Sequence, residues 1–501
     1  MSDHGIVPHR KLITVSLLLA VFIQTLDSLI AVTAMPFIQG AFSASAEEVS
    51  WVLTSSVIAN AIMTAPAAWM AARFGRKQFF LCSLGGFVCM SALSGLSQSL
   101  EQLILCRFIQ GMLGAALIPL GQATMLDLYP VARRPQAMAI FAIGILMGPT
   151  LAPITGAYLT DAYHWRLVFY VSIVPGLLAL LGLALFLPKE SGERALRFNW
   201  YGFAILGLAI GTFQYVLDRG QTLDWFASTE IIATATISGL CFYLFVVHML
   251  TAEKPFLTPA LFKDRNFLAG LMTMACISST MLSTSVLLVP FLQQLAGYPV
   301  LDSGMAMAPR GLGTLMAMFA ASRLVVHVDP RVMIVGGLLT MGWTMLVMST
   351  WTPDVDQTEL MLMLLAQGFG MGMVLNPMLV MSFSELPPHL RAEGVAVQSL
   401  SRTIGSAAGI SVSTFTLIRS TQITHADIVA GITPFRPPLP GLGTSAQLLD
   451  LASTRGALAL EQMATYQAKI IAYNNDFRLM ALIVLPPLIL LLITRRRVAP
   501  T

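Results

Sequence analysis

The stretch VFIQTLDSLIAVTAMPFI, residues 21–38, is an apolar segment that holds one carboxylate, Asp27, near its middle. It belongs to an apolar run from Leu12 to Ile38, and a membrane-spanning helix needs about 20 such residues. No small-residue cleavage site follows the run, so we expect a retained first span. A charge in the hydrocarbon costs at least about 2.5 kcal/mol on insertion scales. The stretch therefore predicts a membrane helix with a functional acid.

The whole chain has the composition of a polytopic membrane protein. Of its 501 residues 56% are hydrophobic and 11% are charged, whereas soluble domains are about a quarter charged. The basic residues are scattered between apolar segments, so the net charge of +4 does not indicate a nucleic-acid partner. The five cysteines lie in or beside apolar segments without the spacing of a metal site. We expect neither a metal nor a disulfide framework.

Apolar segments of spanning length recur along the chain and predict an all-α membrane protein with 14 transmembrane helices. The even number places both termini on one side, and lysine and arginine are more frequent in the segments on that side, nineteen against seven. Both termini are therefore expected in the cytoplasm. The expected spans are 12–37, 50–72, 79–98, 102–125, 137–160, 166–187, 200–217, 230–250, 267–292, 303–323, 332–350, 359–383, 394–418 and 478–494.

An internal repeat divides the chain. RFIQGMLGAALIP (107–119) and LLAQGFGMGMVLNP (364–377) each place Gln-Gly before small residues and a proline. Repeated halves with interrupted helices are typical of secondary transporters. We expect a six-helix bundle at 1–187, two inserted linker helices at 188–266 and a second six-helix bundle at 267–501.

Residues 419–477 are expected to form one long periplasmic loop. The loop contains a proline-rich stretch, TPFRPPLPGLG (433–443), and then a segment whose apolar residues recur at helical spacing. A helix lying on the membrane, a docking surface and a helix capping the outer rim all fit this pattern.

Asp27 is the only carboxylate that the predicted spans place near a membrane centre. Gln24 lies one turn before it, and Ala31 and Ala34 follow one and two turns later, so this helix face is polar and small and should line a cavity. Burial favours a protonated carboxyl group and a nearby arginine favours the ionised form. Asp27 is thus predicted to bind and release a proton, with Arg107 as its partner; a structural Asp–Arg pair is the alternative.

Polar residues in other spans are candidates for the substrate cavity. Arg402 lies one turn after Gln398 and precedes Gly405 and Gly409, a small-residue packing pattern. Arg310, near the outer end of its span, is expected to snorkel to the interface. The cavity candidates are Gln24, Gln110, Asn376, Gln398 and Arg402.

The sequence contains none of the enzyme signatures sought. It has no HExxH, no GxSxG and no GxxxxGK[ST] loop that could hold ATP phosphates. Because no P-loop is present, an ion gradient is the simplest energy source, and no cofactor is expected. Two other functions stay open: a dedicated exporter of one metabolite, such as an aromatic acid or a lipid-like compound, and a non-transporting scaffold or sensor.

Three stretches match motifs of one known family. They are LDSLIAVTAMP (26–36), with Leu29 where threonine is usual, RFIQGMLGAA (107–116), and GILMGPTLAPITGAYL (144–159), which keeps Gly148, Pro149, Pro153 and Gly156. With these motifs the chain resembles the major facilitator superfamily, in its fourteen-helix drug:proton antiporter branch and the EmrB type of multidrug exporter. The resemblance implies proton-coupled efflux of hydrophobic or amphipathic drugs by alternating access, with Asp27 and Arg107 in proton transfer.

The resemblance also extends to a cytoplasmic gate loop and to partners. The superfamily loop motif aligns with Arg73, Gly75 and Arg76, but its aspartate is replaced by Ala72, which removes the usual acid of the charge latch. EmrB-type exporters lie in the inner membrane of the cell and work with a periplasmic adaptor protein and an outer-membrane channel. The implied partners of this chain are therefore the lipid bilayer, protons, small amphipathic substrates and those two proteins.

Overall fold

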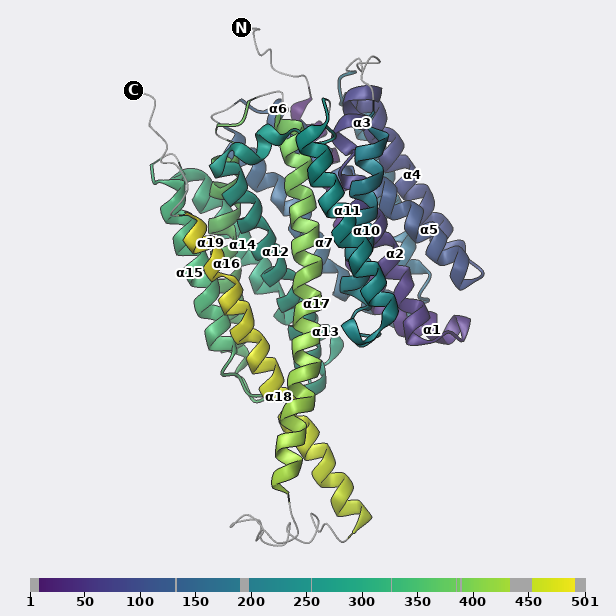
Figure 1. Cartoon of the computed structure of the whole chain (residues 1–501), viewed down its shortest axis with the longest axis vertical. Helices are drawn as coiled ribbons and strands as arrows, with labels where there is room; N and C mark the ends of the chain where they lie inside the picture. The colour runs from purple at the N-terminus through teal and green to yellow at the C-terminus, as the bar shows by residue number, and fades with distance from the viewer. Residues whose placement is uncertain are drawn as a thin grey trace.

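The computed structural model describes residues 9–130, 133–189, 198–253, 255–325, 327–383, 385–387, 390–432 and 453–491, and in these residues the chain is helical without strands. Figure 1 shows one elongated bundle of helices with a two-helix projection at one end. The elements are α1 (Arg10–Phe42), α2 (Ala46–Thr64), α3 (Ala67–Phe74), α4 (Arg76–Leu96), α5 (Leu100–Gly114), α6 (Leu117–Leu128), α7 (Arg134–Ala162), α8 (Leu167–Tyr170), α9 (Ile173–Phe186), α10 (Trp200–Arg219), η2 (Trp225–Ala227), α11 (Thr229–Thr251), η3 (Pro259–Lys263), α12 (Arg265–Pro290), η4 (Phe291–Leu295), α13 (Val300–Ala306), α14 (Ala308–Leu324), α15 (Pro330–Met348), α16 (Gln357–Ser382), α17 (Arg391–Gly431), α18 (Thr454–Ile483) and α19 (Leu485–Leu491).

These helices account for the fourteen expected spans. In the described residues, eleven helices or continuous pairs are long and apolar enough to cross a membrane. The second, tenth and thirteenth expected spans correspond to α2–α3, α14 and α17. The prediction of an all-α membrane fold is therefore confirmed.

The internal repeat has a structural counterpart in how the helices pair. In the N-terminal half α1 packs along α7 and α2 along α5, whereas in the C-terminal half α12 packs along α17 and α14 along α16. The glycine of each Gln-Gly pair makes the second contact possible. A Cβ at Gly111 would lie 2.2 Å from the Ser56 carbonyl oxygen, and one at Gly368 would lie 1.9 Å from the Arg310 carbonyl oxygen. Both repeats therefore place a glycine where two helix backbones touch.

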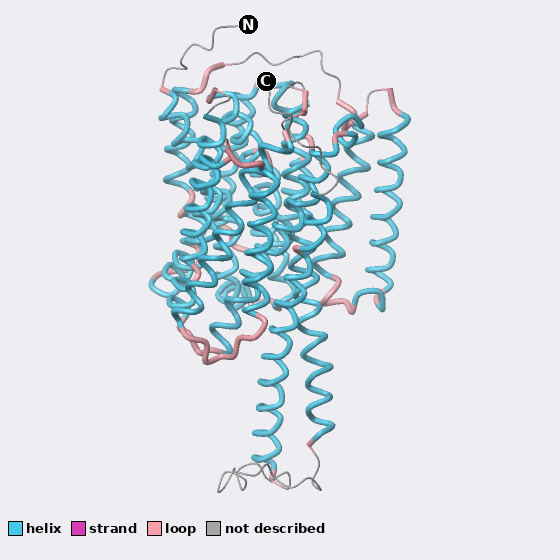
Figure 2. The backbone as a smooth tube through the Cα atoms, turned by 90° about the vertical axis from the view of Figure 1, so that its left-hand side faces the viewer, coloured by secondary structure: helices cyan, strands magenta, loops and turns pink. Residues whose placement is uncertain are grey.

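The prediction that residues 419–477 form a loop is wrong for the described residues. Helix α17 continues through Gly431, and α18 already begins at Thr454, ahead of the expected span at 478–494. With 41 residues, α17 is roughly 60 Å long, about twice the thickness of the hydrocarbon core. Figures 1 and 2 show the ends of α17 and α18 projecting side by side from the bundle.

We call this projection, residues 421–432 and 453–469, the helical hairpin. His425 Nε2 of α17 lies 3.0 Å from Glu461 Oε1 of α18, an ion pair when the histidine is protonated. A helix lying on the membrane and a helix capping the rim are both excluded for the described part, because α18 runs straight into the last span. The polar residues that suggested a loop are mostly exposed or half-buried side chains on these two helices. The proline-rich stretch 433–443 lies outside the described residues.

The chain enters and leaves the bundle at the end opposite the helical hairpin. Figure 1 shows α1 beginning and α19 ending at that end. The inserted helices α10 and α11 pack on each other, and α10 also packs on α2. The segment after α11 is fixed to the start of α17, since the Thr258 backbone N–H and hydroxyl both donate to the Glu393 carboxylate.

Candidate transport site

Asp27 and Arg107 form a buried ion pair at the contact of α1 and α5. Their side chains are 7% and 1% exposed, and Arg107 Nη1 lies 2.5 Å from Asp27 Oδ2. Gln110, one turn after Arg107, donates from Nε2 to Asp27 Oδ1 at 3.2 Å and accepts from Arg107 Nη1 at 2.8 Å. The three side chains thus form a closed triangle of hydrogen bonds, and both carboxylate oxygens are occupied.

The other contacts of Arg107 hold its guanidinium group in place. Nε donates to the Val52 carbonyl oxygen at 3.4 Å, and Nη2 donates to the Asp27 carbonyl oxygen at 3.5 Å. The guanidinium carbon lies 5.7 Å from the centroid of the Phe169 ring. Breaking such a pair by removing one partner typically costs about 3–5 kcal/mol, because a buried charge remains. Arg107 is therefore a buried cation that Asp27 and the backbone carbonyl groups hold in one position.

The equivalent position in the C-terminal half carries no charge. Gln367 corresponds to Gln110 in the repeat, and its Nε2 lies 3.4 Å from Thr284 Oγ1 of α12. Thr284 takes the place of Asp27, and Leu364 takes the place of Arg107. The two halves thus share one framework, and only the N-terminal half has an ion pair on it.

The motif at residues 144–159, with Gly148, Pro149, Pro153 and Gly156, packs α7 closely against α1 next to Asp27. A Cβ at Gly148 would lie 2.1 Å from Thr25 Oγ1 and 2.5 Å from the Leu26 backbone nitrogen. A Cβ at Gly156 would lie 2.1 Å from Thr33 Oγ1. Pro149 and Pro153 lie inside α7. Glycines at this spacing let two helix axes approach closely, so the motif positions the helix that carries Asp27.

The predicted cavity residues do not form one cluster with the ion pair. Gln110 is bonded to Asp27 and Arg107, and Gln24 is 7% exposed beside Gly114. Asn376 of α16 and Gln398 of α17 are 1% and 3% exposed and belong to the other half. Arg402, one turn after Gln398, is half-buried. The structure therefore divides the predicted cavity residues between the two halves. Only Gln110 is bonded to the ion pair of Asp27 and Arg107.

The prediction that Arg310 snorkels to the interface is wrong. Its side chain is buried, and Nη1 and Nη2 donate to Ser285 Oγ at 2.9 Å and to the Met281 carbonyl oxygen at 2.8 Å. The side chain extends from α14 to α12, which supplies both hydrogen-bond acceptors. The next residue, Gly311, lies against Thr150 of α7, so Arg310 is close to the contact between the halves.

The sequence suggested that Asp27 is the only carboxylate inside a span, but the structure contains a second buried acid. Asp476 of α18 is 0% exposed. It was missed because residues 419–477 were assigned to a loop. The run of apolar residues after position 478 marked the last span, but the helix and its burial begin well before it.

The loop with Arg73, Gly75 and Arg76, which the resemblance predicted as a gate loop, has a carboxylate from another helix beside it. Gly75 has φ +86°, which favours glycine, and it turns the chain between α3 and α4. Arg76 Nη1 lies 2.5 Å from Asp127 Oδ2 near the end of α6. Asp127 thus supplies the carboxylate that Ala72 lacks, although such exposed pairs contribute only about 0–1 kcal/mol. Nearby, burial and then Arg391 lower the pKa of Arg134, and Asp127 partly opposes them.

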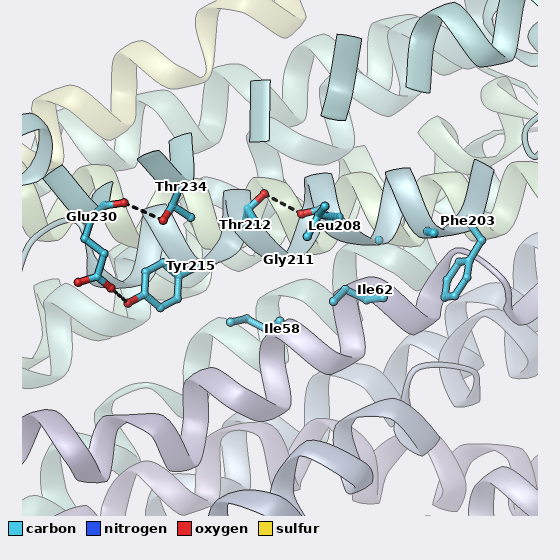
Figure 3. A pocket seen from close by; sticks show the side chains of 11 residues that line it. Ile58, Ile62, Phe203, Leu208, Gly211, Thr212, Tyr215, Glu230 and Thr234 are labelled. Atoms are coloured by element: carbon cyan, nitrogen blue, oxygen red, sulfur yellow. Dashed lines mark hydrogen bonds between the residues drawn. The ribbon is translucent and has the colours of Figure 1, made fainter. Parts of the chain in front are cut away.

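An apolar groove of about 620 Å³ lies between α2 and the inserted helices (Figure 3). At one end the Tyr215 hydroxyl donates to the Glu230 carboxylate. In the middle of the groove Gly207 and Gly211 of α10 face Ile62 of α2, and an added Cβ would lie 3.2 Å and 3.0 Å from it. The lining residues are Ile58, Ile62, Phe203, Ala204, Gly207, Leu208, Gly211, Thr212, Tyr215, Glu230 and Thr234.

Comparison with known proteins agrees with this architecture. The profile of the Major Facilitator Superfamily matches residues 17–410. The chain is 31% identical over 473 residues to the multidrug export protein EmrB of Escherichia coli (strain K12), covering 93% of this chain and 91% of that protein. It is 29% identical over 466 residues to the fatty acid resistance protein FarB of Neisseria gonorrhoeae, covering 93% and 92%.

A solved structure shows the same fold. The bacterial homolog of the human lysosomal transporter Spinster, in an inward-facing and occupied conformation, aligns with a TM-score of 0.59 and 17% identity. The alignment covers 98% of this chain and 97% of that one. The resemblance to EmrB-type exporters that the motifs indicated is confirmed. The protein is a multi-pass membrane protein that belongs to the Major Facilitator Superfamily, among the relatives of EmrB.

Proposed function

We propose that this protein exports hydrophobic or amphipathic compounds in exchange for protons, by alternating access between the bundles 1–187 and 267–501. The observation that carries the proposal is the buried triangle of Asp27, Arg107 and Gln110. An acid fixed against a buried arginine has two states of different charge. Only a conformation that lets water reach Asp27 allows it to change state.

The physical cycle follows from this charge balance. With Asp27 ionised, the pair with Arg107 is neutral and holds α1 against α5. A proton arriving at Asp27 from the outside leaves Arg107 as an uncompensated buried cation, which favours a conformation that rehydrates it. That conformation releases the substrate outward, and loss of the proton to the cytoplasm restores the pair.

Relatives and composition support the substrate class. EmrB is a multidrug export protein, and FarB is a fatty acid resistance protein. Both names are compatible with amphipathic cargo. The 29 methionines of this chain supply adaptable apolar surface, although many of them simply pack helices. The apolar groove beside α10 and α11 offers such molecules a place at the side of the bundle.

A substrate-range efflux assay tests the proposed function. The full chain is expressed in a host without its own pumps, and export of cationic dyes, neutral drugs and anionic detergents is measured with and without a proton gradient. Gradient-dependent export of several chemical classes is expected. A single exported compound would favour a dedicated exporter, and no proton movement on substrate addition to proteoliposomes would favour a scaffold or sensor.

The helical hairpin is proposed to dock a periplasmic adaptor, with the protein in the inner membrane and both termini in the cytoplasm. Its two helices extend the bundle on the side opposite the start of α1 and the end of α19. Such a rigid projection suits a partner that continues the path outward, such as an adaptor joined to an outer-membrane channel. His425 of α17 lies opposite Glu461 of α18, so cutting each helix just beyond these residues shortens both by the same amount.

Replacing residues 426–460 by a short Gly-Ser linker should abolish co-purification of the adaptor while the membrane bundle still folds. The cut removes the ends of both helices at the same level, because His425 lies opposite Glu461. Co-purification and size-exclusion profiles are measured together. The matched control replaces only residues 434–452 by the same linker. Adaptor binding that survives the longer deletion would rule out docking on the hairpin.

A second candidate function, export of anionic amphiphiles, rests on Arg310. Its guanidinium group is buried with two neutral oxygen acceptors and lies close to the contact between the halves. Arg310→Gln should therefore reduce export of fatty acids at least about 10-fold, the loss of one charge-assisted hydrogen bond of roughly 1.5–3 kcal/mol, and leave export of cationic dyes unchanged. The control is Arg323→Gln on the same helix, where the side chain is exposed. Equal losses for both substrate classes would contradict the anion role.

A further inference from the structure

Asp476 is a buried carboxyl group that the ion pair of the N-terminal half does not involve. It lies in α18 with 0% of its surface exposed, and neither Oδ1 nor Oδ2 has a hydrogen-bond partner in the described residues. This differs from Asp27, whose two oxygens are both occupied. A buried acid without partners needs its own physical account.

The residues that flank Asp476 on α18 are buried and mainly apolar. The preceding turn carries Tyr473, whose ring packs edge-on to Phe291 with centroids 5.5 Å apart. The next residue, Phe477, packs against Trp351 at 6.4 Å. One turn further, Met480 is fully buried, and its sulfur lies 3.9 Å from Ser413 Oγ of α17. Helices α12, α15 and α17 thus enclose this part of α18.

No described charge compensates Asp476. The elements packed against α18 are α12, α15, α17, α19 and η4. Tyr473, one turn before Asp476 on α18, carries a phenol, which is uncharged at neutral pH. Arg478 on the same helix and Arg419 on α17 are exposed and point away. The ionisable side chains of those packed elements in the described residues are Arg265 and Cys276 of α12, Arg331 of α15, and Arg391, Glu393, Arg402, Arg419, His425 and Asp427 of α17.

An ionised carboxylate in this place is strongly disfavoured. Burying an unpaired charge costs far more than burying a neutral polar group, so the group neutralises instead. A protonated carboxyl group costs about 1–3 kcal/mol for its unpaired donor and acceptor. We propose that Asp476 is a second proton-binding site, protonated in this conformation and separate from the Asp27–Arg107 pair.

The proton exchanges from the side of the helical hairpin. Toward that side the next contact is polar and part-buried, since Asn475 Nδ2 donates to Ser420 Oγ at 3.0 Å. Toward the other side α18 continues with Met480 and Val484, which are buried and apolar. Separation of α17 from α18 at the hairpin would let water reach Asp476 first. The site therefore binds an external proton when these helices are apart and retains it when they close.

Infrared spectroscopy of the full chain in lipid nanodiscs tests the proton directly. The carbonyl stretch of a protonated carboxylic acid should persist in the wild type from about pH 5 to about pH 8. It should be lost in Asp476→Asn and retained in Asp27→Asn. A spectrum of Asp476→Asn that matches the wild type would overturn the proposal. The readout requires no transport, so its failure is distinct from failure of the proposed function.

Thermal unfolding gives a second, independent measurement. A group that binds its proton more tightly when folded than when unfolded stabilises the fold at low pH, and this stability is lost as the pH rises. Asp476→Asn and Asp476→Leu should therefore melt above the wild type at about pH 8, with the difference shrinking toward about pH 5. Variants that melt well below the wild type at the higher pH would show an ionised, partnered Asp476 and reject the site.

Discussion

Asp27→Asn abolishes export against a gradient while leaving substrate binding measurable. Asparagine preserves the size of the side chain and one of its two acceptor oxygens but cannot change charge, so Arg107 keeps one fixed environment through the cycle. A proton is worth about 2.3 kcal/mol per 100 mV, which corresponds to a roughly 50-fold concentration ratio. That accumulation should fall to none, and exchange down a substrate gradient should continue.

The measurement is substrate accumulation in inside-out vesicles or proteoliposomes with an imposed proton gradient, together with ligand binding to the purified variant. Asp161→Asn is the matched control, because this carboxylate lies on α7 and is exposed. Loss of the ion pair also lowers stability, so a thermal melt must show that the Asp27 variant is folded. Accumulation at the wild-type level would exclude Asp27 as the coupling site.

Gly148→Ala separates α1 from α7 and has the second large effect. The new methyl group would lie 2.5 Å from a backbone nitrogen at Leu26, which cannot rotate away, and 2.1 Å from Thr25 Oγ1. Overpacking of this kind typically costs about 1–3 kcal/mol. Because Asp27 follows Leu26 directly, the shift also displaces the ion pair. We expect a lower melting temperature and a loss of proton-coupled export.

Two further glycines make this prediction specific. A Cβ at Gly156 meets the Thr33 side chain, which can adopt another rotamer, so Gly156→Ala should cost less. Gly40 in α1 has open space where a methyl group would lie, so Gly40→Ala should be neutral or slightly stabilising. Thermal unfolding of the three variants should give the order Gly148, Gly156, Gly40, from the largest loss of stability to the smallest. Equal melting temperatures for Gly148→Ala and Gly40→Ala would disprove the close contact.

Local sequence patterns were enough to predict most of the fold. Apolar segments of about 20 residues can only be satisfied as helices in a bilayer, since every backbone group must be hydrogen-bonded within the segment. The same reasoning identified Asp27, because a charge stands out in such a segment. The partner was predictable as well, since Arg107 lies in an apolar span next to Gln110 and has no other reason to be there.

Other features depended on contacts between distant residues. Hydropathy ends a span where polar residues begin, so it missed that α17 and α18 continue as helices and that Asp476 is buried among α12, α15 and α17. Arg310 was misassigned for the same reason, since its hydrogen-bond acceptors come from another helix, α12. The sequence also did not indicate which acid pairs with Arg76, because Asp127 comes from a different helix.

The sequence by itself determined the class of fold, the family and the charged pair, because each of these follows from composition or from residues at short, regular spacing. The tertiary structure alone decided which polar residues are buried, which carboxylates have partners and how far the last helices extend. Burial and pairing depend on neighbours from other helices, and no local pattern of residues contains that information.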